Sequence, residues 1–172
     1  MLGYDELIGR LLRLDEDAYL QFDDGIDYQC VIVGGGALIL MGFSVRVTHD
    51  IDVLDYAPKQ LQNLMEQHDI NAAVRAYSDC FPPEFEKRAV PLPLKTRKIR
   101  FFTLSLEDLV ISKLCAGRDT DIRDITDPKI LAALDWPKLD ELAQEIKECL
   151  LSDRQISQFS YDYEEYKRRY GK

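Results

Sequence analysis

Two aspartates, Asp50 and Asp52, stand two positions apart in a segment where apolar and polar residues alternate. The alternation predicts a strand from Val45 to Val53, with His49 as the one interruption on its apolar side. Side chains at positions i and i+2 of a strand point the same way, so the two carboxylates would project together. Mg²⁺ binds one or two carboxylates together with phosphate oxygens. The pair therefore indicates a metal site that takes a phosphate-bearing substrate, and a solvated strand face is the alternative.

Three consecutive glycines, Gly34, Gly35 and Gly36, separate the β-branched run Tyr28–Val33 from the apolar run Ala37–Met41. We expect a strand, a tight turn and a buried helix. Glycines let the backbone approach a ligand closely, and a helix that begins beside them directs free N–H groups at phosphate. The sequence is neither a Walker loop nor a dinucleotide fingerprint. A phosphate contact and a structural turn both fit the glycines alone.

Lys113 falls within the apolar stripe of a predicted helix that follows Ser105 and ends at Gly117. A lysine on an inward face must extend to solvent or meet negative charge, from a phosphate or from a carboxylate. Three more charged residues follow at intervals of three, on one side of a helical turn: Arg118, Asp121 and Asp124. On their own these three also fit a solvated cluster of ion pairs.

The order of these motifs is more specific than any one of them. VIVGGGALILMGFSVRVTHDIDV followed by LSLEDLVISKLCAGRDTDIRDI resembles the minimal nucleotidyltransferases of bacterial toxin–antitoxin and abortive-infection systems, the AbiEii-like and MenT-like proteins of the polymerase-beta-like superfamily. The resemblance covers residues 28–134. The usual Gly-Ser of the turn is Gly-Gly here, so one hydroxyl contact to phosphate is missing. A third carboxylate on a central strand is not evident, and Asp121 or Asp124 would have to replace it.

The resemblance implies an enzyme, a Mg²⁺-dependent nucleotidyltransferase. It would move a nucleoside monophosphate from a nucleoside triphosphate, with ATP among the candidates, to an acceptor hydroxyl. The residues implied for catalysis are Asp50 and Asp52, which would hold the metal, with Lys113, Asp121 and Asp124. The residues implied for nucleotide binding are Gly34, Gly35, Gly36, Arg46, Thr48, Lys113 and Arg118.

The resemblance also implies an acceptor and a biological role. The acceptor would be a tRNA 3′ end or a protein, and the chain would be a toxin that a cognate antitoxin controls. Asp121 or Asp124 would serve as a base or orient Lys113. The alternative is a noncatalytic interaction or regulatory protein of the same fold, acting through its tyrosine-rich C-terminal helix.

The composition limits where the protein works. Its 172 residues include 31 acidic and 22 basic side chains, for a formal net charge of −9, which argues against broad nucleic-acid binding. Four cysteines lie far apart with only two histidines, so neither a zinc site nor a disulfide framework is expected. The N-terminus lacks the build of a secretory signal, and no apolar run is long enough to span a bilayer. We expect a soluble cytoplasmic protein with no membrane partner.

One segment departs from this acidic balance. Between Phe85 and Arg100, six basic residues accompany a single acidic one, Glu86: Lys87, Arg88, Lys95, Arg97, Lys98 and Arg100. Such a segment could follow an RNA backbone. A solvated loop beside a strand is the alternative.

Helical patterns outnumber strand patterns along the chain. An amphipathic helix is predicted to end near Phe22, and further helices are predicted to begin near Pro58, Ser105, Asp127, Pro137 and Ser152. Lys98–Leu104 adds one more clear strand. This pattern predicts an α+β fold, with a small mixed nucleotidyltransferase-type sheet flanked by helices and a helical C-terminal part. We expect residues 1–134 to form the core and residues 135–172 a helical extension packed on it.

Overall fold

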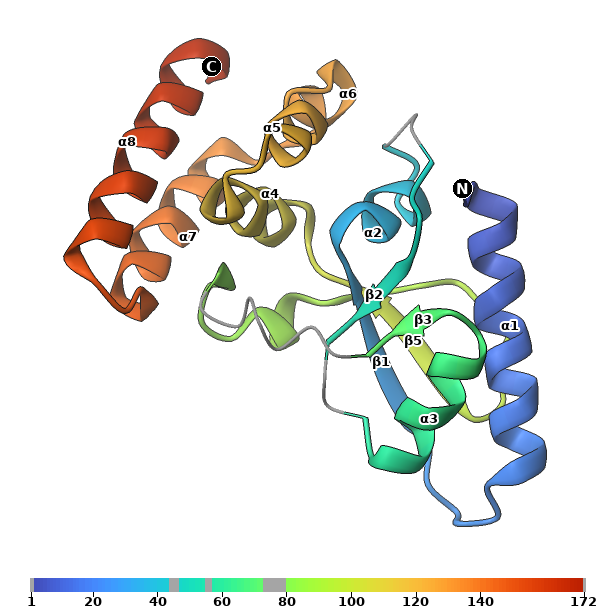
Figure 1. Ribbon diagram of the computed structural model, residues 1–172. Coiled ribbons are helices and arrows are strands. Elements are labelled where there is room, and N and C mark those ends of the chain that lie inside the picture. Colours follow the sequence, from blue (N-terminus) through green and yellow to red (C-terminus); the bar gives the residue numbers. More distant parts are fainter. Residues whose placement is uncertain (1, 44–46, 55–56, 73–79, 172) are drawn as a thin grey trace. The chain divides into compact units, whose positions relative to one another are not determined.

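The computed structural model describes residues 2–43, 47–54, 57–72 and 80–171 (Figure 1). The chain forms two compact units, of which the first comprises residues 1–75 and 89–104. The second comprises residues 76–88 and 105–172. The predicted division at residue 134 falls inside the second unit, and as a boundary between separately folding domains it stays a prediction.

The first unit is built on a mixed sheet. Within the described residues it has five strands in the order β3-β2-β1-β5-β4. β1 is central, antiparallel to β2 and parallel to β5, while β2 is parallel to β3 and β5 is antiparallel to β4. The strands are β1 (Tyr28–Val33), β2 (Ile51–Val53), β3 (Ile70–Asn71), β4 (Val90–Pro91) and β5 (Ile99–Thr103). The helices of this unit are α1 (Tyr4–Gln21), α2 (Gly34–Leu40) and α3 (Lys59–Gln67).

The two faces of the sheet differ in burial. One face is apolar and buried, with Cys30, Ile32, Ile51, Val53, Ile99 and Phe101 at most 2% exposed. The register pairs Val33 with Asp52 and Asp52 with Asn71, which places Asp52 and Asn71 on the opposite face. Along the strands that face is half-buried or exposed at Gln29, Val31, Asp52, Asn71, Arg100 and Phe102. We call it the accessible face.

A buried carboxylate ties α1 to the start of β5. Asp15 accepts hydrogen bonds from the backbone N–H groups of Arg97, Lys98 and Ile99, at 2.9, 2.8 and 2.7 Å. Three charge-assisted bonds satisfy a carboxylate that is only 5% exposed. This contact fixes how α1 lies along the sheet of the first unit (Figure 1).

Residues 45 and 46 of the predicted strand from Val45 to Val53 lie outside the described residues, and the prediction is wrong for residues 47–50. Regular pairing begins only at Ile51, and Val47, predicted to be buried, is 39% exposed. The cause is a competing partner, because Thr48 exchanges two backbone hydrogen bonds with Leu2 in place of a neighbour in the sheet. His49 is exposed, as is Asp50, which directly precedes β2.

The second unit is helical. Its helices are α4 (Leu106–Ala116), α5 (Asp119–Ile125), α6 (Pro128–Ala133), α7 (Trp136–Cys149) and α8 (Asp153–Tyr170), with the short 3-10 helix η2 (Phe85–Arg88). The predicted caps are confirmed: Ser105, Asp127 and Ser152 each accept a hydrogen bond from a backbone N–H of the first turn. Gly117 ends α4 with φ +63°, a left-handed conformation that favours glycine.

The α+β fold class is thus confirmed, with a mixed sheet, flanking helices and a helical C-terminal part. In the part of the chain that the structure describes, every helix is too short or too polar to cross a membrane.

Candidate active site

Asp50 and Asp52 lie at the start of β2, and backbone contacts fix both. Asp52 sits between β1 and β3 on the accessible face, half-buried, while Ile51 and Val53 anchor the strand on the buried face. The Thr48 hydroxyl donates a hydrogen bond to the backbone carbonyl of Asp50 at 3.2 Å. The chain therefore presents two carboxylates from one short, anchored segment.

The glycine turn lies against these two aspartates. Gly34 has φ +66°, and a Cβ atom built on it would stand 3.2 Å from Oδ2 of Asp52. At Gly36 a Cβ would stand 3.8 Å from the backbone oxygen of Asp50. The pairing of Val33 with Asp52 causes this closeness, because the residue after Val33 must then turn beside the carboxylate. The structure thus brings Gly34, Gly36, Asp50 and Asp52 together, while Gly35 is half-buried in the first turn of α2.

Asn71 joins this group without any signal in the sequence pattern. Its side-chain amide donates a hydrogen bond of 2.9 Å to Oδ1 of Asp52. The contact depends on the parallel register of β2 and β3, in which these two residues are neighbours. β3 is only two residues long, too short for a periodic pattern to reveal.

Lys113, Asp121 and Asp124 form a buried cluster within the second unit. The lysine Nζ donates to Oδ1 of Asp121 at 2.9 Å and to Oδ2 of Asp124 at 2.8 Å. All three are buried, with the lysine 4% exposed. Of the two predicted alternatives, Lys113 does not extend to solvent but meets negative charge, from two carboxylates of α5.

Arg118 completes this cluster and connects it to solvent. Its Nε donates to Oδ2 of Asp121 at 2.6 Å, while 62% of its side chain is exposed. Burial acts to raise the pKa of Asp121, but hydrogen bonds from Arg118 and Lys113 outweigh it and hold the pKa below its ordinary value. The two roles predicted for Asp121, a base or a group that orients Lys113, stay predictions.

The first unit supplies a donor set that suits Mg²⁺. Asp50 and Asp52 offer carboxylate oxygens, the ligands this ion prefers, and phosphate oxygens and water usually complete its octahedron. Among the described residues no group of three or more His, Cys, Asp or Glu side chains could hold a metal by itself. Arg46, predicted to bind nucleotide, lies outside the described residues.

The cations of the basic segment, residues 85–100, have different surroundings in the structure. Three of its six cations form ion pairs, Lys87 with Glu84, Arg88 with Asp108 and Lys98 with Asp24. Arg97 stacks over the ring of Tyr19, 5.1 Å from its centroid. Arg100 is exposed on the accessible face. The segment is therefore less cationic than its composition predicts.

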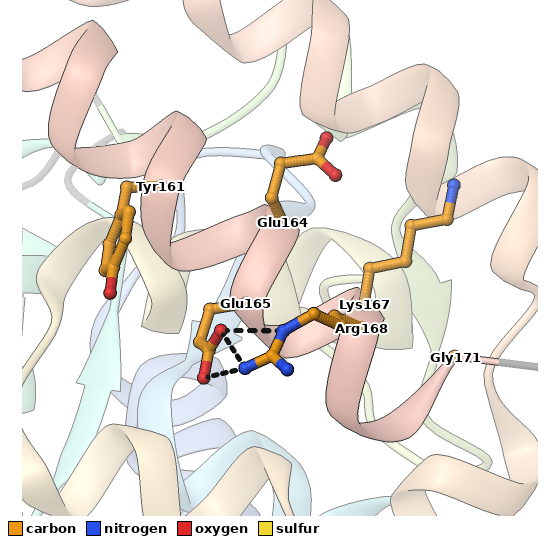
Figure 2. Close-up of a pocket in the computed structure, with 6 residues that line it drawn as sticks. All are labelled: Tyr161, Glu164, Glu165, Lys167, Arg168 and Gly171. Carbon is orange, nitrogen blue, oxygen red and sulfur yellow. Dashed lines mark hydrogen bonds and ion pairs between the residues drawn. The ribbon is translucent and has the colours of Figure 1, made fainter.

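A cavity of about 550 Å³ lies along α8, and its lining includes none of the predicted site residues. It is lined by Tyr161, Glu164, Glu165, Lys167, Arg168 and Gly171. Figure 2 shows Glu165 paired with Arg168, at 2.6 Å in the shortest contact. Arg169 pairs with the same carboxylate. The cations lower the pKa of Glu165.

One comparison with known proteins found a match. The profile of a family described as "Nucleotidyltransferase of unknown function (DUF6036)" matches residues 9–171. The chain belongs to this family. The match spans residues of both compact units, and the family's description supports a general nucleotidyltransferase activity and hence an enzyme. Searches of the curated proteins and of the solved structures gave no match.

Proposed function

We propose that this DUF6036 protein is a Mg²⁺-dependent enzyme that transfers a nucleoside monophosphate from a nucleoside triphosphate to an acceptor hydroxyl. The observation that carries the proposal is the contact of the glycine turn with the acidic pair: Gly34 lies against the Asp52 carboxylate. Glycines beside the Asp52 carboxylate leave room for a phosphate chain, and this carboxylate together with that of Asp50 offers ligands for its counterion.

Different residues of the chain would bind the metal and the phosphates. Asp50 and Asp52 would hold Mg²⁺, which supplies charge stabilisation at the phosphates when bound. Gly34 and Gly35 would lie beside the β and γ phosphates, because neither carries a Cβ atom. Gly36 is buried and packs against Ile32 and Ile51 instead. The acceptor oxygen would bond to the α phosphorus as the bond to the β-phosphate oxygen breaks, with pyrophosphate as the leaving group and the hydroxyl proton passing to solvent.

The roles of the second unit's cluster are a separate part of the proposal. Lys113 and Arg118 would neutralise the triphosphate. Within its own unit the lysine already meets two carboxylates, whereas the arginine exposes most of its side chain. Asp121 accepts hydrogen bonds from both cations within this unit.

The acceptor and the biological role rest on the AbiEii-like and MenT-like resemblance. It supports a tRNA 3′ end or a protein as acceptor, and a toxin controlled by an antitoxin. The alternative is a noncatalytic protein that acts through its tyrosine-rich helix, α8, where Tyr161 is 69% exposed. Tyr163 and Tyr166 are buried and donate hydrogen bonds to Asp140 and to the carbonyl of Ile125.

Two labels on the same substrate test the reaction class. The protein is incubated with Mg²⁺ and each nucleoside triphosphate, labelled at the α or at the γ phosphate, in parallel with total tRNA and with protein extract. Nucleotidyl transfer puts the α label on the acceptor and leaves the γ label in pyrophosphate. Transfer of the γ label would indicate a kinase, and no transfer of either label with any acceptor would contradict the proposal. Arrested growth on induced expression tests the toxin role separately.

A further inference from the structure

We infer that Asn71 is a positioning residue for the proposed nucleotidyl transfer, because its side-chain amide fixes the orientation of the Asp52 carboxylate beside the glycine turn. The inference rests on the proposed function and adds a residue to it. It starts from one contact, the hydrogen bond of 2.9 Å from Nδ2 of Asn71 to Oδ1 of Asp52.

The fold places Asn71 at this point by three local features. α3 ends at Gln67, and Asp69 takes a left-handed conformation with φ +54° that turns the chain directly into β3. Ile70 is 2% exposed and anchors the strand on the buried face. Asn71 must then point to the accessible face, where the parallel register sets it beside Asp52.

The two carboxylate oxygens of Asp52 have different neighbours. Oδ1 accepts from the amide of Asn71, and Oδ2 is the atom that faces Gly34. The terminal torsion of an aspartate is broad, so a hydrogen bond to one oxygen narrows the orientations that the carboxylate takes. The amide therefore keeps one chosen oxygen directed at the turn where the phosphates would enter.

An amide suits this task better than a cation would. Lysine or arginine at this position would neutralise the charge that a metal ligand needs, whereas asparagine is a neutral donor. Groups that orient metal ligands typically change metal affinity or activity about 10- to 100-fold when they are removed. The same range is expected for loss of the Asn71 amide.

The test uses a variant that removes the donor and keeps the strand. Asn71→Val retains a good strand former, and Gln29→Val is the matched control, an amide on the same accessible face that is outside the site. Mn²⁺ binding is measured by electron paramagnetic resonance with a nonhydrolysable nucleoside triphosphate analogue, together with the melting temperature. We expect Asn71→Val to weaken Mn²⁺ binding about 10- to 100-fold at a melting temperature close to that of the control. Asn71→Gln, which restores an amide donor, should recover part of the affinity.

The outcomes separate this inference from the proposed function. If the wild-type protein binds Mn²⁺ with nucleotide and Asn71→Val binds it equally well, the inference alone is overturned. If affinity and melting temperature fall together in Asn71→Val and again in Asn71→Thr, Asn71 is a structural residue and the inference is likewise overturned. If the wild-type protein neither binds Mn²⁺ with nucleotide nor transfers label, both proposals fail.

Discussion

Oδ2 of Asp52 lies 3.2 Å from the position that a Cβ atom on Gly34 would occupy. The pairing of Val33 with Asp52 across β1 and β2 creates this relationship. A side chain at position 34 would therefore press directly on the carboxylate that the proposal assigns to metal binding. Position 34 therefore requires glycine, because only glycine combines the left-handed backbone with the space that Asp52 needs.

Gly34→Ala should abolish nucleotide-dependent metal binding and destabilise the protein by about 1–3 kcal/mol, the usual cost of a strained backbone conformation. The backbone strain has a matched control in Gly25→Ala. Gly25 has φ +68°, nearly the same as Gly34, but a Cβ there meets nothing within 4 Å. Gly25→Ala should lose similar stability and keep metal binding. Urea unfolding and Mn²⁺ titration measure the two effects, and equal losses of metal binding in both variants would refute the specific role of the Gly34 contact.

Lys113→Met should lower the free energy of unfolding by about 3–5 kcal/mol, because it leaves two buried carboxylates without their shared cation. The control is Lys138→Met, which breaks the exposed pair of Lys138 with Glu141 and should cost less than about 1 kcal/mol. Chemical denaturation of both variants gives the comparison. A cost below 1 kcal/mol for Lys113→Met would mean that the cluster contributes little to the stability of the second unit.

The lowered pKa of Asp121 predicts a defined pH dependence. A carboxylate whose pKa is lower in the folded state than in the unfolded state stabilises the protein above its unfolded pKa, near 4, and loses that contribution as the pH falls through the folded value. The difference in unfolding free energy between wild type and Asp121→Asn should therefore be constant above about pH 5 and shrink toward lower pH. Denaturation at a series of pH values measures it. A difference that grows on acidification would contradict the lowered pKa.

Tyr166→Phe should destabilise the protein by about 0.5–1.5 kcal/mol, the net contribution of a typical buried hydrogen bond. Its hydroxyl donates to the carbonyl of Ile125 at 2.7 Å and links α8 to α5. Tyr161→Phe is the control, since Tyr161 is 69% exposed and should change the stability by a few tenths of a kcal/mol at most. Thermal unfolding measures the change in stability of both variants. An equal effect of the two substitutions would show that α8 is not held by this bond.

Local signals in the sequence predicted most of the elements. β1 matches the predicted strand at both ends, because a β-branched run stands between an Asp-Asp-Gly cluster and three glycines. α4 likewise follows its Ser105 cap and ends at Gly117. In each case the residues that begin and end the element are adjacent to it in the chain.

The failures have nonlocal causes. The strand predicted from Val45 is shorter because Thr48 pairs with Leu2, a residue 46 positions away in the sequence. Asn71 was missed because its contact with Asp52 depends on the register of two strands joined through α3. The cations at 88 and 98 are neutralised by Asp108 and Asp24, which the fold supplies from other segments.

The sequence predicted the individual residues of the candidate site, and the structure brings some of them together. The closeness of the glycine turn to the acidic pair and the pairing of Lys113 with Asp121 and Asp124 are both present. The catalytic and nucleotide-binding roles of these residues stay predictions.

The decisive experiment for the proposed metal-dependent transfer measures the rate at which Asp52→Asn transfers the α-labelled nucleoside monophosphate, beside wild type and Asp23→Asn. Asp23 is an exposed aspartate of the same unit, outside the candidate site. We expect Asp52→Asn to lose about 100-fold in transfer rate, because a metal ligand is removed, and Asp23→Asn to keep the wild-type rate. If folded Asp52→Asn transfers label at the wild-type rate, Asp52 is not a metal ligand for this reaction.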